Sequence, residues 1–183
     1  PQADFLGVDF SPESVARARR LIDEAELGNV RVEEASFADL AADPPADKVD
    51  FAMAHGVWTW VDDTVRGQIV DALGRCLAPG ALVYMGYTAA AVWSAADPIR
   101  QIFRAAPPGP PDARYGPARR AVDGWLALNA TQAPEAARLW DKLSSVSDDF
   151  LAHELGSAHG TGIWPETLQA ALADAKLAYA CPA

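Results

Sequence analysis

Short apolar runs alternate with amphipathic segments over the first half of the chain. Residues 4–10 are an apolar run closed by an acid, which is typical of a buried strand. A helix is predicted to follow, because Ser11 is a good N-cap and Pro12 suits the first helical position. Apolar residues then recur at helical spacing until Gly28, where the helix is expected to end.

The same alternation continues to residue 88. The further elements that it predicts are strands at 30–37, 49–58 and 81–87, a helix at 62–77, an acidic loop at 40–48 and a turn at 78–80. Strands that alternate with helices favour right-handed crossovers. The pattern therefore predicts an α/β fold with a parallel sheet and helices on both faces.

After Thr88 the pattern becomes helical. Segments 97–106, 117–130 and 133–146 carry apolar residues at helical intervals, and a proline-glycine loop at 107–117 separates the first two. We therefore expect a core at 1–88, a helical insert at 89–160, and a return to the core at 161–183 through a helix and a strand.

Composition narrows the function classes. The 183 residues carry a net charge of −10, which argues against binding to a nucleic-acid backbone. Cys76 and Cys181 lie far apart without flanking histidines, so neither a disulfide nor a metal site is predicted. There is no bilayer-length apolar run and no secretory signal, so we expect a cytoplasmic protein with no membrane partner.

Residues that follow the strands are the first candidates for ligand contacts, because ligands of open α/β sheets bind at the carboxyl ends of strands. Asp9 follows the first strand, where a carboxylate can accept hydrogen bonds from two ribose hydroxyls. The alternative is that Asp9 only caps the next helix, although Ser11 already suits that role. Ser36 and Phe37 follow the second strand and could flank an adenine; the alternatives are a core Phe37 and a local cap from Asp39.

The stretch 55–61, HGVWTWV, brings an imidazole, a glycine and two indoles to the end of the third strand. Trp58 and Trp60 would face opposite ways on an extended backbone. His55 is the candidate proton acceptor, against a structural role, and Tyr87 is a candidate substrate contact, against a packing role. His153 and Glu154 have no second matching ligand pair, so they predict no metal site.

Four segments in order, GVDFSPESVARARR, NVRVEEASFADL, VDFAMAHGVWTWVDD and LAPGALVYMGY, resemble the post-strand motifs of class I S-adenosylmethionine-dependent methyltransferases. FADL, HGVWTWV, LAPGALVY and FLAHEL are similar, more narrowly, to a bacterial group that carries a methyltransferase regulatory domain. The resemblance covers residues 5–88 and extends loosely beyond them. It implies a Rossmann-like sheet and methyl transfer, EC 2.1.1, to a small-molecule or protein acceptor.

The resemblance also implies roles for residues. Asp9 would hold the ribose of S-adenosylmethionine with Phe10 packed beside it, and Ser36 and Phe37 would border the adenine, although the family usually has an acid at the position of Ser36. The residues that would line the methionine end and the transfer path are His55, Gly56 and Val57. Methyl transfer needs alignment of the nucleophile more than a strong base, so His55 would take the proton of an amine or hydroxyl, and Trp58 and Tyr87 would contact the substrate.

The family's first strand and its Gly-rich turn should precede Asp9, and no G-x-G occurs there. That strand lies at the centre of the family's sheet, so we expect an incomplete sheet in two halves, and weak cofactor binding by residues 1–183 alone. Two alternatives stay open. One is a nicotinamide-dependent oxidoreductase, which also uses an acid after the second strand, although no Tyr-x-x-x-Lys pair supports it. The other is a non-catalytic methyltransferase-like domain that binds a protein through its Trp-bearing insert.

Overall fold

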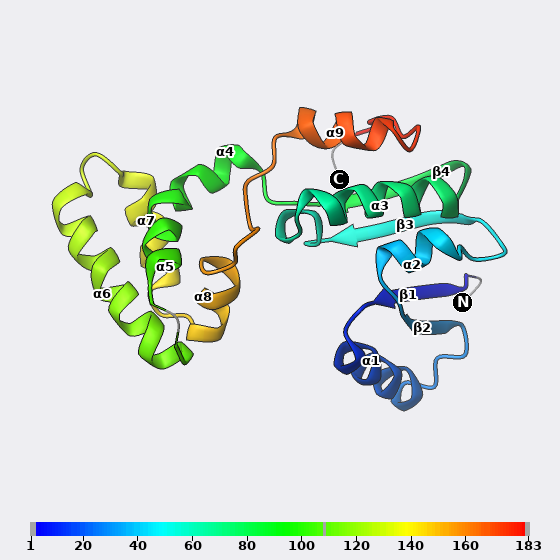
Figure 1. Cartoon of the computed structure of the whole chain (residues 1–183), viewed down its shortest axis with the longest axis horizontal. Coiled ribbons are helices and arrows are strands. Elements are labelled where there is room, and N and C mark those ends of the chain that lie inside the picture. The colour runs from blue at the N-terminus through cyan, green and yellow to red at the C-terminus, as the bar shows by residue number, and fades with distance from the viewer. Residues whose placement is uncertain (1–2, 108, 182–183) are drawn as a thin grey trace. The chain divides into compact units, whose positions relative to one another are not determined.

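The computed structural model describes residues 3–107 and 109–181 of the chain. They form an α/β fold, as predicted, and Figure 1 shows the order of the elements. The strands are β1 (Phe5–Asp9), β2 (Val30–Glu34), β3 (Val49–His55) and β4 (Leu77–Gly86). The helices are α1 (Pro12–Glu24), α2 (Phe37–Ala42), α3 (Asp63–Cys76), α4 (Ala90–Trp93), α5 (Asp97–Ala105), α6 (Pro111–Asn129), α7 (Pro134–Leu143), α8 (Asp148–Glu154) and α9 (Pro165–Ala173), with 3-10 turns η1 (Trp58–Trp60) and η2 (Ser94–Ala96).

The chain divides into two compact units. The sheet unit comprises Pro1–Ala52, Asp63–Val83 and Ala171–Ala183. The helical unit comprises Met53–Asp62 and Tyr84–Ala170. The predicted insert at 89–160 lies within the helical unit, and the domain boundaries themselves remain a prediction.

In the sheet unit, β1 and β2 pair in parallel, with Phe5 opposite Val30 and Asp9 opposite Glu34. The intervening α1 begins as predicted, because the Ser11 hydroxyl accepts a hydrogen bond from the Ser14 N–H. This helix packs against the two strands (Figure 1) and buries Val15. The predicted β-α-β unit is confirmed.

The four strands form two separate pairs, β1–β2 and β3–β4. No ladder joins the pairs among residues 3–107 and 109–181, so the expectation of a sheet in two halves is confirmed. Each inner edge keeps unpaired backbone groups, as an edge strand does.

Three local predictions are wrong. Residues 37–42 form α2, where the pattern predicts the end of a strand at 37 and a loop from 40, because Ser36 and Asp39 make a capping box that favours a helix. Strand β4 starts at Leu77 and runs through the predicted turn, where Gly80 has a φ of +84°. Residues 177–181 form no strand; residues 182 and 183 lie outside the described part.

The predicted proline-glycine loop is largely helical. Helix α6 begins at Pro111, a residue type that suits a helix start, and it contains Pro117. Pro117 lies within the second turn, so its missing N–H costs one backbone bond without ending the helix. The predicted loop also includes residue 108, which lies outside the described residues.

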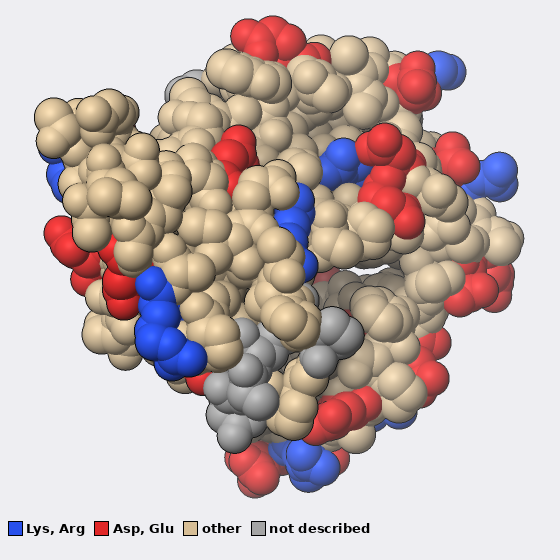
Figure 2. Space-filling model, turned by 60° about the vertical axis from the view of Figure 1, so that its left-hand side comes forward, with Lys and Arg blue, Asp and Glu red and all other residues tan. Residues whose placement is uncertain are grey.

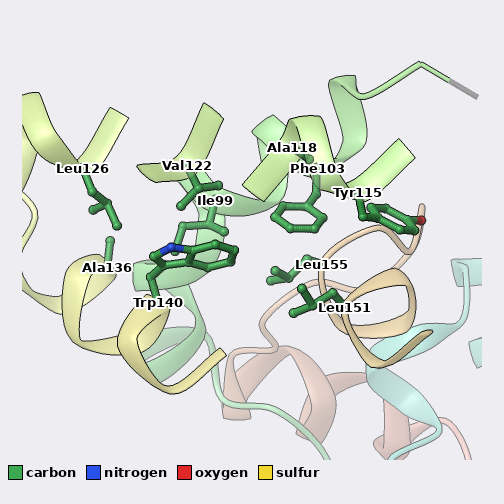
Figure 3. Packing of buried hydrophobic residues seen from close by; sticks show 10 residues of the cluster. All are labelled: Ile99, Phe103, Tyr115, Ala118, Val122, Leu126, Ala136, Trp140, Leu151 and Leu155. Carbon is green, nitrogen blue, oxygen red and sulfur yellow. The ribbon is translucent and has the colours of Figure 1, made fainter. Parts of the chain in front are cut away.

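A single apolar cluster holds the helical unit together (Figure 3). Its buried members come from α5, α6, α7, α8 and the residue after α8: Ile99, Phe103, Tyr115, Ala118, Val122, Leu126, Ala136, Trp140, Leu151 and Leu155. Phe103 packs its ring against Tyr115 and Trp140 at centroid distances of 5.6 and 5.9 Å. The Trp140 indole donates its N–H to Asp123 Oδ1 at 2.7 Å, so this ring is both packed and anchored.

The described helices include none that is both long and apolar enough to cross a membrane. On the face that Figure 2 shows, Lys and Arg side chains are scattered among acidic ones instead of forming a continuous basic stripe. That distribution agrees with the acidic net charge.

Candidate functional site

Asp9 lies at the carboxyl end of β1 with its side chain exposed. Its Oδ1 accepts a hydrogen bond from the Ser11 N–H at 2.8 Å, which fixes the direction of the carboxylate. Ser11, not Asp9, supplies the side-chain cap of α1. Oδ2 has no hydrogen-bond partner among the described residues, so the carboxylate keeps an acceptor for a ligand.

Ser36 and Phe37 follow the point where β2 pairs with the end of β1, since the Ala35 N–H donates to the main-chain carbonyl of Asp9 at 3.1 Å. The Ser36 hydroxyl is occupied by the capping box: it donates to Asp39 Oδ2 at 2.6 Å and accepts from the Asp39 N–H at 3.1 Å. These bonds from Ser36 lower the pKa of Asp39. Phe37 is half-buried and Phe10 is 77% exposed. The sheet unit thus brings the predicted ribose and adenine residues together.

His55 lies at the end of β3 against β4. The Gly56 N–H donates to the Gly86 carbonyl at 3.1 Å, which fixes the two chain ends beside each other. The His55 Nδ1 lies 3.3 Å from the Tyr84 hydroxyl, and the two rings stack at 15° with centroids 5.9 Å apart. A Cβ at position 86 would lie 2.3 Å from Nδ1, so the imidazole occupies the space that the glycine leaves.

The backbone after His55 turns sharply. Gly56 has a φ of +69°, which favours glycine, and Val57 is half-buried before η1. The prediction of an extended backbone at Trp58 and Trp60 is wrong, because these residues form a 3-10 turn. Trp58 is 2% exposed, and its predicted contact with the substrate stays a prediction. Tyr87 is half-buried next to Gly86, and its predicted substrate contact also stays a prediction.

A segment that the sequence did not single out covers the residues after β3 and β4. We call residues 157–163 the strap. The Thr161 N–H donates to the Thr59 carbonyl at 3.3 Å, and the Ile163 N–H donates to the Thr88 carbonyl at 2.9 Å. Thr59, itself fully buried, accepts the Thr88 N–H on its hydroxyl at 2.9 Å. The strap therefore lies along the predicted ligand edge of these two strands.

Arg104 holds the strap at its first half. Its guanidinium donates to the carbonyls of Ser157, Ala158 and Gly160 at 2.9 to 3.1 Å. A Cβ on Gly160 would lie 2.3 Å from the Trp60 ring, so the strap packs too closely there for a side chain. The Trp60 ring in turn lies 4.6 Å from the His153 ring.

A charged group is buried beneath the strap. Arg100 is 2% exposed, lies over the Trp93 ring at 5.4 Å, and has no hydrogen-bond partner for Nε among the described residues. Burial lowers the pKa of Arg100, and the nearby Arg104 charge lowers it further, against the opposing effect of Asp97 and Glu154. Burial also raises the pKa of Glu154, which His153 and Arg100 partly offset. No sequence signal could have revealed the buried Arg100 and its neighbours, because these residues come together only through helix packing.

Metal binding has no support in the described part of the chain. Nowhere in residues 3–107 and 109–181 do three His, Cys, Asp or Glu side chains gather in a way that could hold a metal ion.

Known proteins match the chain at both the sequence and the structural level. Residues 1–80 match the family model described as a methyltransferase domain. Residues 1–80 are therefore similar to a methyltransferase domain. The predicted resemblance to class I methyltransferases is thereby confirmed, whereas the narrower resemblance to the group with a regulatory domain stays a prediction.

Relatives of this methyltransferase domain occur in several bacteria. An uncharacterized protein of Rickettsia prowazekii is 30% identical over 103 residues, 56% of the chain and 40% of that protein. An uncharacterized protein of Synechocystis is 27% identical over 97% of the chain and 36% of its own length. Trans-aconitate 2-methyltransferase of Methylobacterium nodulans is 36% identical over 80 residues, 44% of the chain and 27% of that enzyme.

The fold extends beyond the methyltransferase domain. The structure of PKMT2 from Rickettsia typhi in complex with AdoHcy superposes on 98% of the chain with a TM-score of 0.75 and 24% identity. The chain spans 35% of that protein, and between 27 and 40% of the curated relatives named above. The helical unit therefore shares its fold with a solved methyltransferase structure, and the predicted fold class is confirmed.

Proposed function

We propose that the chain carries out S-adenosylmethionine-dependent methyl transfer to a small-molecule or protein acceptor. The observation that carries this proposal is the Asp9 carboxylate, anchored through Oδ1 at the end of β1 within the segment that matches a methyltransferase domain. Its Oδ2 can accept the hydrogen bonds of ribose hydroxyls, as the ligand edge of an open α/β sheet requires. That PKMT2 was solved with AdoHcy supports S-adenosylmethionine as the cofactor.

The other predicted residues have roles that agree with their surroundings. Phe10 and Phe37 offer apolar surface beside Asp9 for the nucleoside, and Ser36 lies at the start of α2 next to them. Gly56 and Val57 would line the methionine end, with Tyr87 at the acceptor. His55 is exposed, so it can reach a substrate amine or hydroxyl.

The reaction is a displacement at the methyl carbon. A nucleophilic nitrogen or oxygen forms a bond to that carbon while the carbon–sulfur bond breaks, and the sulfonium takes up the electron pair as a neutral thioether. The nucleophile then carries a proton in excess, which His55 accepts. Holding the nucleophile in line contributes most of the acceleration, and the proton acceptor contributes less.

Calorimetric titration of an N-terminally extended chain with S-adenosylmethionine tests the proposal. Asp9→Ala should weaken binding by about 1.5–3 kcal/mol, or about tenfold to 150-fold, because it removes a charged hydrogen-bond acceptor. Asp9→Asn keeps the bond to the Ser11 N–H and should lose less. Asp23→Ala, an exposed acid on α1, is the matched control and should leave the affinity unchanged.

Unchanged affinity in Asp9→Ala would remove Asp9 from the site. Absence of binding in an N-terminally extended chain would instead favour the non-catalytic module. Binding of a nicotinamide dinucleotide in place of S-adenosylmethionine would favour the oxidoreductase.

A further inference from the structure

The surroundings of His55 have a feature that its predicted role does not explain. Tyr84 and Gly86 contact the imidazole, and the Gly86 carbonyl accepts a hydrogen bond from Gly56, the residue after His55. All of these residues belong to the helical unit. Gly86 leaves the space for the ring, the Gly56–Gly86 bond sets the register of the two strand ends, and Tyr84 meets Nδ1. Nε2, the opposite nitrogen, has no partner among the described residues.

These contacts permit two hydrogen-bonding arrangements. If the Tyr84 hydroxyl donates to Nδ1, the proton of the neutral imidazole resides on Nε2, which is then a donor and cannot accept a proton. If Nδ1–H donates to the Tyr84 oxygen, Nε2 keeps its lone pair and can act as a base. The two arrangements therefore predict opposite chemistry for His55.

We infer that Tyr84 is a positioning residue that accepts a hydrogen bond from His55 Nδ1–H and so leaves Nε2 as the proton acceptor. This inference rests on the proposed methyl transfer. The arrangement serves the whole reaction, because both the neutral imidazole and the imidazolium donate from Nδ1. When Nε2 takes the proton of the nucleophile, the bond to Tyr84 is kept, and the imidazolium later releases the proton to water.

The stacked geometry adds to the argument. A ring separation of 5.9 Å at 15° restricts rotation of the imidazole on one side, and Gly86 borders it at the nitrogen that faces Tyr84. A ring flip would exchange Nδ1 with the Cδ2 carbon and lose the hydrogen bond without gaining another among the described contacts. His55 is therefore held with Nε2 directed away from Tyr84.

Nitrogen-15 spectra of histidine-labelled chain provide the test. The chain has three histidines, so His55→Gln assigns the signals of His55. The unaltered chain should show neutral His55 mainly as the Nδ1–H tautomer. Tyr84→Phe keeps the stacked ring but removes the oxygen, so it should lower the ratio of Nδ1–H to Nε2–H by about fivefold, the ratio that one net hydrogen bond holds. Tyr179→Phe, at an exposed tyrosine, is the control and should change nothing.

Two results would overturn the inference: a predominant Nε2–H tautomer in the unaltered chain, or an unchanged spectrum in Tyr84→Phe. The first does not depend on Tyr84→Phe, so the test holds even if that variant folds poorly. The spectra need neither cofactor nor acceptor. If the chain shows the Nδ1–H tautomer but an N-terminally extended chain does not bind S-adenosylmethionine, the result would support the role of Tyr84 and overturn the proposed function.

Discussion

Gly86 and His55 share a space that holds only one side chain. A methyl group on Gly86 would lie 2.3 Å from Nδ1 and 3.2 Å from the His55 Cα, so either the ring or the strand end has to move. Gly86 has no left-handed φ, so its need for glycine comes from this contact and not from backbone conformation. A substitution at residue 86 therefore tests how firmly the His55 ring is held in this position.

Gly86→Ala should lower the free energy of unfolding by about 1–3 kcal/mol, the usual cost of overpacking. The double variant His55→Ala/Gly86→Ala should recover part of this loss, because the imidazole is no longer present. Gly124→Ala is the control: it lies exposed within α6 with nothing within 4 Å of the new methyl group, so it should raise stability by about 0.5–1 kcal/mol. Urea unfolding followed by tryptophan fluorescence measures all three, and an unchanged midpoint in Gly86→Ala would contradict the clash.

At the scale of single residues, the sequence predicts features formed by residues that lie close together in the chain. Asp9, Ser11 and Pro12 lie close together in the chain, so their strand end and helix start could be read from their residue types. Tyr84 and His55 lie 29 positions apart, and their contact depends on the pairing register of two strands. A shift of one residue would turn Tyr84 to the other face, and no local pattern fixes that register.

At the scale of the elements, hydrogen bonds from Arg104 fix the position of the strap more than the strap's own side chains do. Its three carbonyl contacts span residues 157–160, and Arg104 is the donor to each. The partners lie 53 or more positions apart, so periodicity could not reveal them. Periodicity did predict α5 and α7, whereas the capping box of α2 was a local signal that the alternating pattern of 30–37 concealed.

Arg104→Met should lower the free energy of unfolding by about 2 kcal/mol, because the methionine fills space but leaves the carbonyls of Ala158 and Gly160 without this donor, whereas the Ser157 carbonyl keeps Arg100. Amide hydrogen exchange should accelerate at Thr161 and Ile163, whose N–H groups fasten the strap to Thr59 and Thr88. Arg138→Met is the matched control, since Arg138 makes an exposed ion pair with Glu135 on the surface of α7 and should cost less than about 1 kcal/mol. Equal losses in the two variants would contradict a special role for Arg104.

At the scale of the whole molecule, each of the two units contains its own reporter of unfolding. The six tryptophans all lie in the helical unit, whereas both cysteines lie in the sheet unit. Cys76 is 7% exposed, and burial raises the pKa of its thiol, although Lys48 partly opposes the shift. The thiol therefore reacts slowly while the sheet unit is folded.

In a Cys181→Ser chain, alkylation of Cys76 should begin at lower urea than the change in tryptophan fluorescence. The sheet unit buries the smaller set of large apolar side chains, among them Val15, Ile69 and Val70, and its two strand pairs keep unpaired edges. Fluorescence should report the later loss of the helical cluster. Coincident midpoints would show instead that the units unfold together.

Arg104 donates hydrogen bonds only to main-chain carbonyl oxygens, which every residue type has. Ser157 and Ala158 can therefore be exchanged for larger, charged or aromatic residues while the strap keeps its course along β3 and β4, whereas Gly160 cannot, because Trp60 fills the room beside it. Because these hydrogen bonds involve only the backbone, side chains of the strap at the rim of the site can change one at a time, in evolution or by design, while the backbone keeps its position.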